Sequence, residues 1–185
     1  MEYCLFFLHN KEIDNYRRDL VCAIANEFGL MHTKKANNYA HFTLKYKFKA
    51  NTKQLEKLKE TLSKFSKTHT KQKIKVGGFD NFHKRVVFVK GSQSQKINNI
   101  ILELHKELKK LKWLTWHKNI EDNGIHLHTT ITEECNEKLY PKIMKFLKGK
   151  EKYFDSYFDN ITIMKYSTAK KPTRRCVIEK TYKLQ

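Results

Sequence analysis

The sequence contains no uninterrupted apolar run of about 18 residues, the length that a membrane-spanning helix needs. Its first residues, MEYCLFFLHNKEI, lack the basic start and the small-residue cleavage site of a signal peptide. No linker and no low-complexity segment divides the 185 residues. We therefore expect a single domain over residues 1–185, with no membrane attachment and a cytoplasmic location.

Cysteine is also scarce, and no pair has the Cys-x-x-Cys spacing. The four cysteines are Cys4, Cys22, Cys135 and Cys176. Their spacing excludes the dense disulfide framework of small secreted domains, so we expect reduced, partly buried thiols. A zinc site built from His126, His128 and Cys135 can be drawn, but no second ligand pair accompanies it. We expect neither a metal nor a cofactor.

Acidic residues are half as frequent as basic ones, 19 against 38, and the formal net charge is +19. Such an imbalance favours a polyanionic partner such as RNA or DNA. Only five of the basic residues are arginine, and lysine can also accumulate on any solvated surface. The charge therefore supports a nucleic-acid partner without identifying one.

The segment HFTLKYKF, residues 41–48, alternates apolar and polar side chains with a period of two. This alternation is typical of a half-buried strand and places the histidine and the threonine on one face. The polar face consists of His41, Thr43, Lys45 and Lys47. The segment IHLHTTIT, residues 125–132, repeats the pattern His-x-Thr-apolar, with His128 and Thr130 on one face.

The rest of the chain alternates between strand-like and helix-like patterns. The predicted order is strand, helix, motif strand, helix, two strands, helix, motif strand, helix and two strands, so the second half resembles the first. The helices are expected near 10–28, 52–65 (with Thr52 as N-cap), 97–111 and 136–147. This order predicts an α+β domain whose helices cover one face of the sheets and leave the other face open.

Two histidines that face one substrate can act as base and acid in a single step, because imidazole exchanges protons near neutral pH. A threonine two residues along the same strand can donate a hydrogen bond to an anionic oxygen. His41 and His128 with Thr43 and Thr130 therefore suit a phosphodiester, with no metal required. His126 shares the face of His128 and is read as accessory or exposed. The six other histidines lack the motif and are expected at the surface: His9, His32, His69, His83, His105 and His117.

With these two motifs the sequence resembles the 2H phosphoesterases, a family named for two His-x-Thr/Ser-apolar motifs, and most of all their 2′-5′ RNA ligase-like or cyclic phosphodiesterase group. AHFTLKY matches the first motif and LHTTIT the second. The resemblance implies a bilobal, pseudo-symmetric fold in which two antiparallel-rich sheets line a central cleft, with helices outside. It also implies hydrolysis of a 2′,3′-cyclic phosphate to a 2′-phosphate, or cleavage or joining of 2′-5′ linkages in RNA. Many relatives have proline before each motif histidine, where this chain has Ala40 and Leu127.

Carried over by position, His41 and His128 become the proton-transfer pair, and Thr43 and Thr130 become the phosphate-binding donors. Lys45 and Tyr166 are further candidates for substrate binding, because Lys45 follows the first motif and Tyr166 ends a late strand. Weaker candidates, for gripping a phosphate or stacking on a base, are Arg174, Arg175, Phe79, Phe82 and Tyr39.

The expected partner is an RNA or nucleotide that carries a 2′,3′-cyclic phosphate or a 2′-5′ linkage, bound by a monomer. An alternative is a non-catalytic RNA-binding module that uses the basic cleft and whose histidines only hydrogen-bond phosphate. Two groups that titrate near neutral pH favour the enzyme, since binding alone would not need them.

Overall fold

The computed structural model describes residues 1–30, 39–117, 126–133, 135–166 and 176–185. Its elements are β1 (Glu2–Leu8), α1 (Lys11–Phe28), β2 (His41–Lys49), α3 (Thr52–Thr68), β3 (Gln72–Phe82), β4 (Val86–Gly91), α4 (Gln95–Lys109), β5 (His128–Thr132), α6 (Tyr140–Leu147), β6 (Tyr153–Phe158), β7 (Asn160–Tyr166) and β8 (Cys176–Lys183). The α+β fold class is confirmed.

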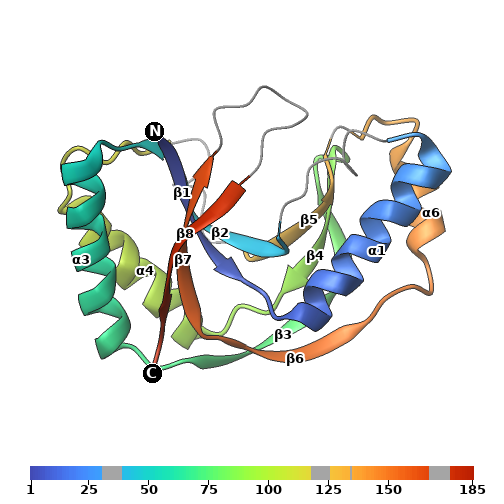
Figure 1. Ribbon diagram of the computed structural model, residues 1–185. Helices are drawn as coiled ribbons and strands as arrows, with labels where there is room; N and C mark the ends of the chain where they lie inside the picture. Colours follow the sequence, from blue (N-terminus) through green and yellow to red (C-terminus); the bar gives the residue numbers. More distant parts are fainter. Residues whose placement is uncertain (31–38, 118–125, 134, 167–175) are drawn as a thin grey trace.

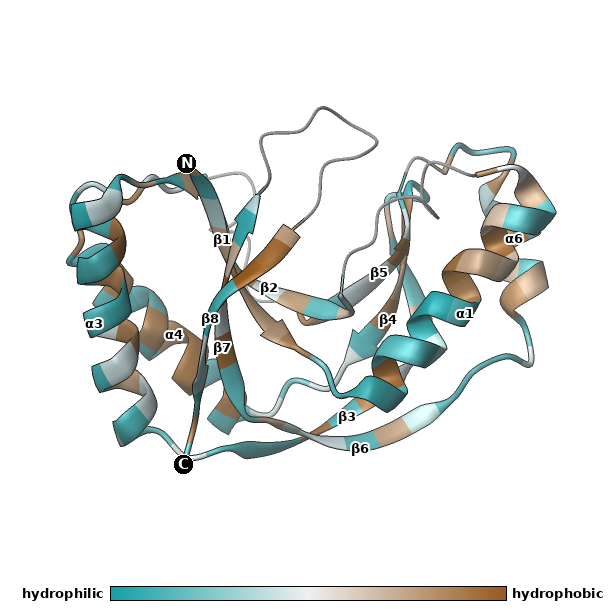
Figure 2. Cartoon of the chain, in the orientation of Figure 1, coloured by the Kyte–Doolittle hydropathy of each residue, from teal (hydrophilic) through white to brown (hydrophobic). Residues whose placement is uncertain are grey.

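Two antiparallel sheets of four strands each form the two lobes (Figure 1). Sheet A has the order β2-β1-β7-β8, and sheet B has the order β5-β4-β3-β6. Each motif strand is thus the edge strand of its own sheet. Helices α3 and α4 pack beside sheet A, whereas α1 and α6 pack beside sheet B. Figure 2 shows the apolar sides of these helices turned toward the sheets.

Local sequence explains most helix boundaries. Asn10 caps α1 by accepting from the Ile13 amide, and Gly29 ends the helix at a φ of 71° that favours glycine. Helix α3 is capped by Asn51 and not by Thr52 as predicted, because Asn51 forms a reciprocal capping box with Gln54.

Two predictions about the second half were wrong. Helix α6 begins at Tyr140 and not at 136. Residues 137–139 form a turn before it, and Pro141 lies at the start of the helix, where its missing amide proton is tolerated. Strand β6 was not predicted at all, because its sequence YFDSYF places aromatic residues on both faces and so hides the period of two.

Each motif strand contains an irregularity directly after its threonine. In the pairing of β1 with β2, Phe6 lies opposite Thr43 and Leu5 opposite Lys45, which leaves Leu44 as an extra residue. In the pairing of β4 with β5, Phe88 lies opposite Thr130 and Val87 opposite Thr132, so Ile131 is extra in the same way. These paired β-bulges reverse the inside and outside positions beyond each motif.

A half-buried histidine joins the two lobes. His9 follows β1, and its Nε2 atom lies 2.7 Å from the Thr129 hydroxyl of β5, which itself donates to the backbone carbonyl of His41 at 3.2 Å. Since that hydroxyl proton is engaged, His9 Nε2 must be the donor. The ring lies edge-on to Phe7 and Phe42, and its Nδ1 has no partner among the described residues. The expectation that His9 lies at the surface was wrong.

Burial, assisted by the positive charge that His41 can carry, lowers the pKa of His9 to about 3.

Among the described helices, none is long and apolar enough to cross a membrane.

We predict that the protein loses stability as the pH falls from about 6.5, the pKa of an unfolded histidine, toward 3. In that interval the unfolded His9 binds a proton that the folded His9 rejects, so its share of the unfolding free energy falls by up to about 1.4 kcal/mol per pH unit. His9→Gln keeps a donor for Thr129 but cannot titrate. Urea unfolding at several pH values should therefore show a shallower pH dependence for His9→Gln than for wild type.

The control is His83→Asn, a change at an exposed turn residue with a φ of 49°, where asparagine is tolerated. This control should retain the wild-type pH dependence. An unchanged slope in His9→Gln would show that His9 takes up no extra proton on unfolding.

Candidate active site

The two motif strands lie next to each other although they belong to different sheets. The contact runs through Thr129, the residue between His128 and Thr130, whose hydroxyl donates to the carbonyl of His41. In addition, the charge that His128 can carry contributes to lowering the pKa of His41. The fold therefore brings both predicted histidines to one place.

The His41 ring is held on two sides. Its Nδ1 lies 2.6 Å from the carbonyl of Tyr39, and the ring stacks on Phe6 of the neighbouring strand, with 3.7 Å between centroids and 14° between planes. A carbonyl oxygen can only accept, so Nδ1 carries the proton of the neutral ring. Nε2 is left as the atom that can take up a proton.

The second motif repeats this arrangement. The Nδ1 atom of His128 lies 2.7 Å from the carbonyl of His126, again two residues earlier. The ring packs against Phe88 at 5.1 Å and edge-on against Phe82 at 4.8 Å. Both motif histidines thus have the same tautomer and the same free nitrogen, and each lies against a phenylalanine of the neighbouring strand.

The surroundings favour neutral imidazoles. Burial, opposed by the hydrogen bond to the Tyr39 carbonyl and assisted by the charges of Arg17 and His128, lowers the pKa of His41 to about 4. Burial also lowers the pKa of His128, helped by the charge that His126 can carry. Both rings are therefore uncharged near pH 7 and able to accept a proton.

The motif threonines occupy matching positions. Thr43 is exposed opposite Phe6, and Thr130 is half-exposed opposite Phe88. Each lies on the face of its strand that carries the motif histidine, as the alternation predicted. Two hydroxyl donors thus accompany the two imidazoles.

Lys45 does not lie on that face. The bulge at Leu44 turns Lys45 inward, where it is fully buried and its Nζ atom lies 4.7 Å from the ring centroid of Trp116. The prediction that Lys45 lies on the same face of the strand as Thr43 was wrong, because the bulge interrupts the alternation of side chains. Lys47 extends over the ring of Tyr166 instead, at 4.7 Å from the centroid.

Tyr166 ends β7 on the same face of sheet A as Phe6, in a small cluster with Cys4, Met164 and Cys176. Burial, followed by the influence of Cys4 and Cys176, raises the pKa of its hydroxyl. Of the weaker candidates, Phe79 packs against the core, Phe82 lies beside His128, and Tyr39 is 43% exposed. Arg174 and Arg175 lie outside the described residues.

Helix α1 holds both motifs, a role that the sequence patterns did not reveal. Its Asp14 accepts from the amide of Ala40, the residue before His41, at 2.6 Å. Three residues along the helix, Arg17 donates from Nε to the carbonyl of Thr130 at 3.0 Å. The spacing places the two side chains on one face, next to the buried stripe. The sequence signal for this role was the position of two charged residues, Asp14 and Arg17, beside the apolar stripe of the helix.

Two more histidines that were expected at the surface are half-buried. His105 lies 2.7 Å from the carbonyl of Leu44 and edge-on to Trp116, whereas His69 stacks on Phe65. His83 and His117 are exposed, and His32 lies outside the described residues. Within the described part of the chain, no three His, Cys, Asp or Glu side chains converge as a metal site would require, and Cys135 is buried.

Comparisons with known proteins agree with this fold. The model of the 2′-5′ RNA ligase superfamily matches residues 24–170. A comparison with curated proteins finds no match. Among solved structures, TT0787 of Thermus thermophilus has a TM-score of 0.66 at 11% identity and covers 100% of this chain and 98% of its own. LigT of E. coli complexed with 3′-AMP has a TM-score of 0.66 at 12% identity, with 99% and 97% covered.

At these identities the solved structures support the fold alone. The family model spans most of the chain and includes both His-x-Thr segments, which confirms the resemblance drawn from the motifs. The chain belongs to the 2′-5′ RNA ligase superfamily.

Proposed function

We propose that the protein is a metal-independent RNA phosphoesterase. It hydrolyses 2′,3′-cyclic phosphate ends to 2′-phosphates, or it cleaves or joins 2′-5′ phosphodiester linkages. The observation that carries this proposal is the repeated motif geometry, in which each imidazole keeps Nε2 available beside a threonine hydroxyl. The catalytic pair would be His41 and His128, and the phosphate would be bound by Thr43 and Thr130.

In the hydrolytic reaction, one imidazole takes a proton from water through Nε2 while the water oxygen attacks phosphorus. The bond from phosphorus to the 3′ oxygen breaks, and the second, protonated imidazole gives its proton to that oxygen. The products are a 2′-phosphate and a 3′-hydroxyl, and the two histidines have exchanged protonation states. The geometry is similar at both, so it does not assign either as the base.

The threonine hydroxyls donate to the non-bridging oxygens, where negative charge grows in the transition state. Arg17 adds a positive charge close to His41. The structures of E. coli LigT with 3′-AMP, ATP and NADP+ are consistent with a nucleotide ligand for this fold. We extend this ligand class to the present chain, acting as a single-domain monomer in the cytoplasm.

The second candidate function is a non-catalytic RNA-binding module, which the net charge of +19 favours. Incubation with nucleoside 2′,3′-cyclic phosphates, followed by chromatography of the products, separates the two functions. Release of a 2′-phosphate supports the enzyme. Binding without turnover supports the module.

We predict that His41→Ala and His128→Ala each lower kcat/KM on a 2′,3′-cyclic phosphate by about 100-fold or more. The double variant should lose less than the product of the two effects, since the pair acts as a unit. Thr43→Ala and Thr130→Ala should cause smaller losses, because water and nearby cations replace part of one hydroxyl. A folded single-histidine variant with near wild-type turnover would remove that histidine from the reaction.

The pH profile of kcat/KM should be bell-shaped, since one histidine must be neutral and the other protonated. Both pKa values lie below the ordinary 6.5, so the optimum of the free enzyme should lie on the acid side of pH 6.5. Arg17→Gln should raise the apparent pKa to which His41 contributes, because it removes a positive charge near His41, and should reduce kcat about tenfold because the backbone of Thr130 loses its hydrogen bond to Arg17.

Arg17→Lys should keep that apparent pKa near the wild-type value while kcat stays reduced, because the charge remains but the planar Nε donor is lost. Arg18→Gln is the matched control, since its side chain is exposed and contacts Asp14 only from outside. If Arg17→Gln and Arg18→Gln gave the same pH profile, Arg17 would have no part in tuning the site.

Activity should persist in excess EDTA, because acid, base and anion donors are all supplied by side chains. Turnover measured with EDTA, and again after adding Mg²⁺, Mn²⁺ or Zn²⁺, checks this. Loss in EDTA with recovery on adding one ion would require a metal-dependent mechanism.

A further inference from the structure

Sheet B has an open face that extends well beyond the motif. His128 and Thr130 of β5 lie opposite Lys90 and Phe88 of β4, which point to the same side. On β3 that side carries Lys73, Lys75 and, opposite Phe88, the exposed Asp80, and on β6 it carries Asp155 and Tyr157, paired with the two lysines. The opposite side packs into the core through Ile74, Val76, Val87, Val89 and Ile131.

The face is continuous between the motif and β6. A Cβ atom placed on Gly78 would lie 3.5 Å from Cε of Lys90 and 3.3 Å from the Tyr153 hydroxyl, so the Lys90 and Tyr153 side chains flank this glycine. Gly78 has a φ of 69° and forms the bulge of β3. Because Gly77 and Gly78 carry no side chains, the Tyr153 ring lies over Gly77, and the side chains of Lys90 and Tyr153 meet over Gly78.

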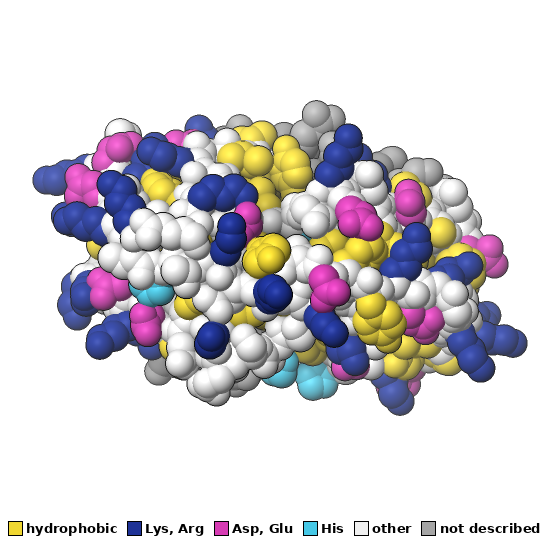
Figure 3. Space-filling view, turned by 90° about the horizontal axis from the view of Figure 1, so that it is seen from below, with side chains coloured by type: hydrophobic (Ala, Val, Ile, Leu, Met, Phe, Trp, Pro, Cys, Tyr) yellow, Lys and Arg dark blue, Asp and Glu magenta, His cyan; other side chains and the backbone are white. Residues whose placement is uncertain are grey.

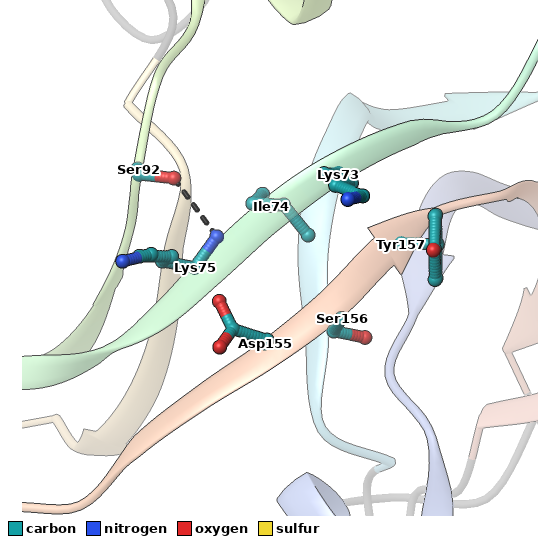
Figure 4. Close-up of a pocket in the computed structure, with 7 residues that line it drawn as sticks. All are labelled: Lys73, Ile74, Lys75, Ser92, Asp155, Ser156 and Tyr157. Atoms are coloured by element: carbon teal, nitrogen blue, oxygen red, sulfur yellow. Dashed lines mark hydrogen bonds between the residues drawn. The ribbon is translucent and has the colours of Figure 1, made fainter.

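At its far end the face is hollowed. A groove of about 640 Å³ lies over β3 and β6, lined by Lys73, Ile74, Lys75, Ser92, Asp155, Ser156 and Tyr157 (Figure 4). The Ser92 hydroxyl, which accepts from the Lys75 amide at 2.9 Å, closes one end. Figure 3 shows basic, hydrophobic and acidic side chains interspersed on the side of the molecule where β3 and β6 lie.

The composition of this groove fits a single-stranded polynucleotide. Tyr157 is 46% exposed and Tyr153 is 74% exposed, which offers flat rings on which bases can stack. The lysines next to them supply charges for phosphates, and Lys71 adds another, with Nζ 5.6 Å from the Tyr157 centroid. Asp155, the only acidic lining residue, can accept a hydrogen bond from a base amino group.

The dimensions suit several nucleotides. Three strand spacings separate β5 from β6, about 14 Å at about 4.8 Å per spacing. Lys73, the partner of Tyr157, lies four residues along β3 from Gly77, which is beside Lys90, and this adds an offset of about 13 Å along the strands at about 3.3 Å per residue. The diagonal is about 19 Å, and because a stacked strand advances about 3.4 Å per nucleotide, this path corresponds to about six nucleotides.

We propose that this open face of sheet B, from His128 to Tyr157, binds the single-stranded RNA that precedes the reacting phosphate. The substrate is then an RNA end of several nucleotides and not a mononucleotide. This inference rests on the proposed function, since it takes the reacting phosphate to lie at His128.

The test compares a mononucleoside 2′,3′-cyclic phosphate with oligoribonucleotides of two to eight residues that carry the same 3′-terminal nucleotide and cyclic phosphate. For the wild-type protein, kcat/KM should rise by about tenfold or more with length and level off near six nucleotides. Equal kcat/KM at all lengths would overturn the inference while leaving the proposed function intact.

Tyr157→Ala and the double variant Lys73→Gln/Lys75→Gln should remove most of the gain with length, through KM, while turnover of the mononucleotide stays the same. Tyr157→Phe should restore the gain, because its ring still stacks. Lys64→Gln/Lys67→Gln, on the exposed side of α3, removes the same charge elsewhere and serves as the control. A gain with length that survives the groove variants would place the RNA on another surface and contradict the proposal.

Binding gives a readout that does not depend on turnover. Fluorescence anisotropy with a labelled six-residue RNA ending in a 3′-phosphate should show weaker binding for both groove variants. The slope of log affinity against log salt should fall by about 0.7 per lysine that contacts a phosphate. A duplex of the same length should bind less tightly, because its bases cannot stack on tyrosine.

If no cyclic phosphate is turned over but the groove variants still weaken RNA binding, the proposed function fails and the RNA path stands. If the groove variants bind like the control, the path is wrong whatever the activity.

Discussion

The hydrogen bond from the Thr129 hydroxyl to the carbonyl of His41 is the contact on which the candidate site depends. The two motif strands are edges of different sheets, so no β-ladder fixes one against the other. Thr129 and His9 supply a buried polar connection at this junction, and the surrounding core of phenylalanine rings makes an unmade hydrogen bond costly there. Helix α1 adds a second connection through Asp14 and Arg17, one to each motif.

The paired bulges explain how one short strand can serve both the core and the site. Up to the threonine, each motif strand presents its histidine to the open face, and beyond the bulge the next polar residue, Lys45 or Thr132, is buried. A regular strand would leave those residues on the open face and turn the following ones inward. The same device in both lobes indicates that the two halves are related in structure as well as in motif.

Charge and burial act in the same direction on the imidazoles. A chain with a net charge of +19 attracts anions, yet the same positive field, together with burial, disfavours protonated histidine at the site. A bound phosphate would reverse part of this effect by pairing with the imidazolium. The two imidazoles are thereby kept neutral when the site is empty, and one of them can hold a proton more easily when an anion is bound.

The sequence by itself determined the local features of this protein. The alternation of apolar residues such as Phe42, Leu44 and Phe48 predicted the strands, and the apolar stripes predicted the helices. The two His-x-Thr patterns predicted four candidate site residues and the family. These features depend on neighbours within a few positions, which periodicity records directly.

Only the tertiary structure decided which distant residues complete the site. Lys45 does not lie on the open face because β2 has a bulge at Leu44. That bulge depends on how β1 and β2 pair, and the register of this pairing cannot be read from either strand alone. His9, Asp14 and Arg17 matter through contacts with residues 26 to 120 positions away. A single side chain gives no periodic signal of such a contact, because its partner is fixed by the packing of the two lobes and not by its own neighbours in the chain.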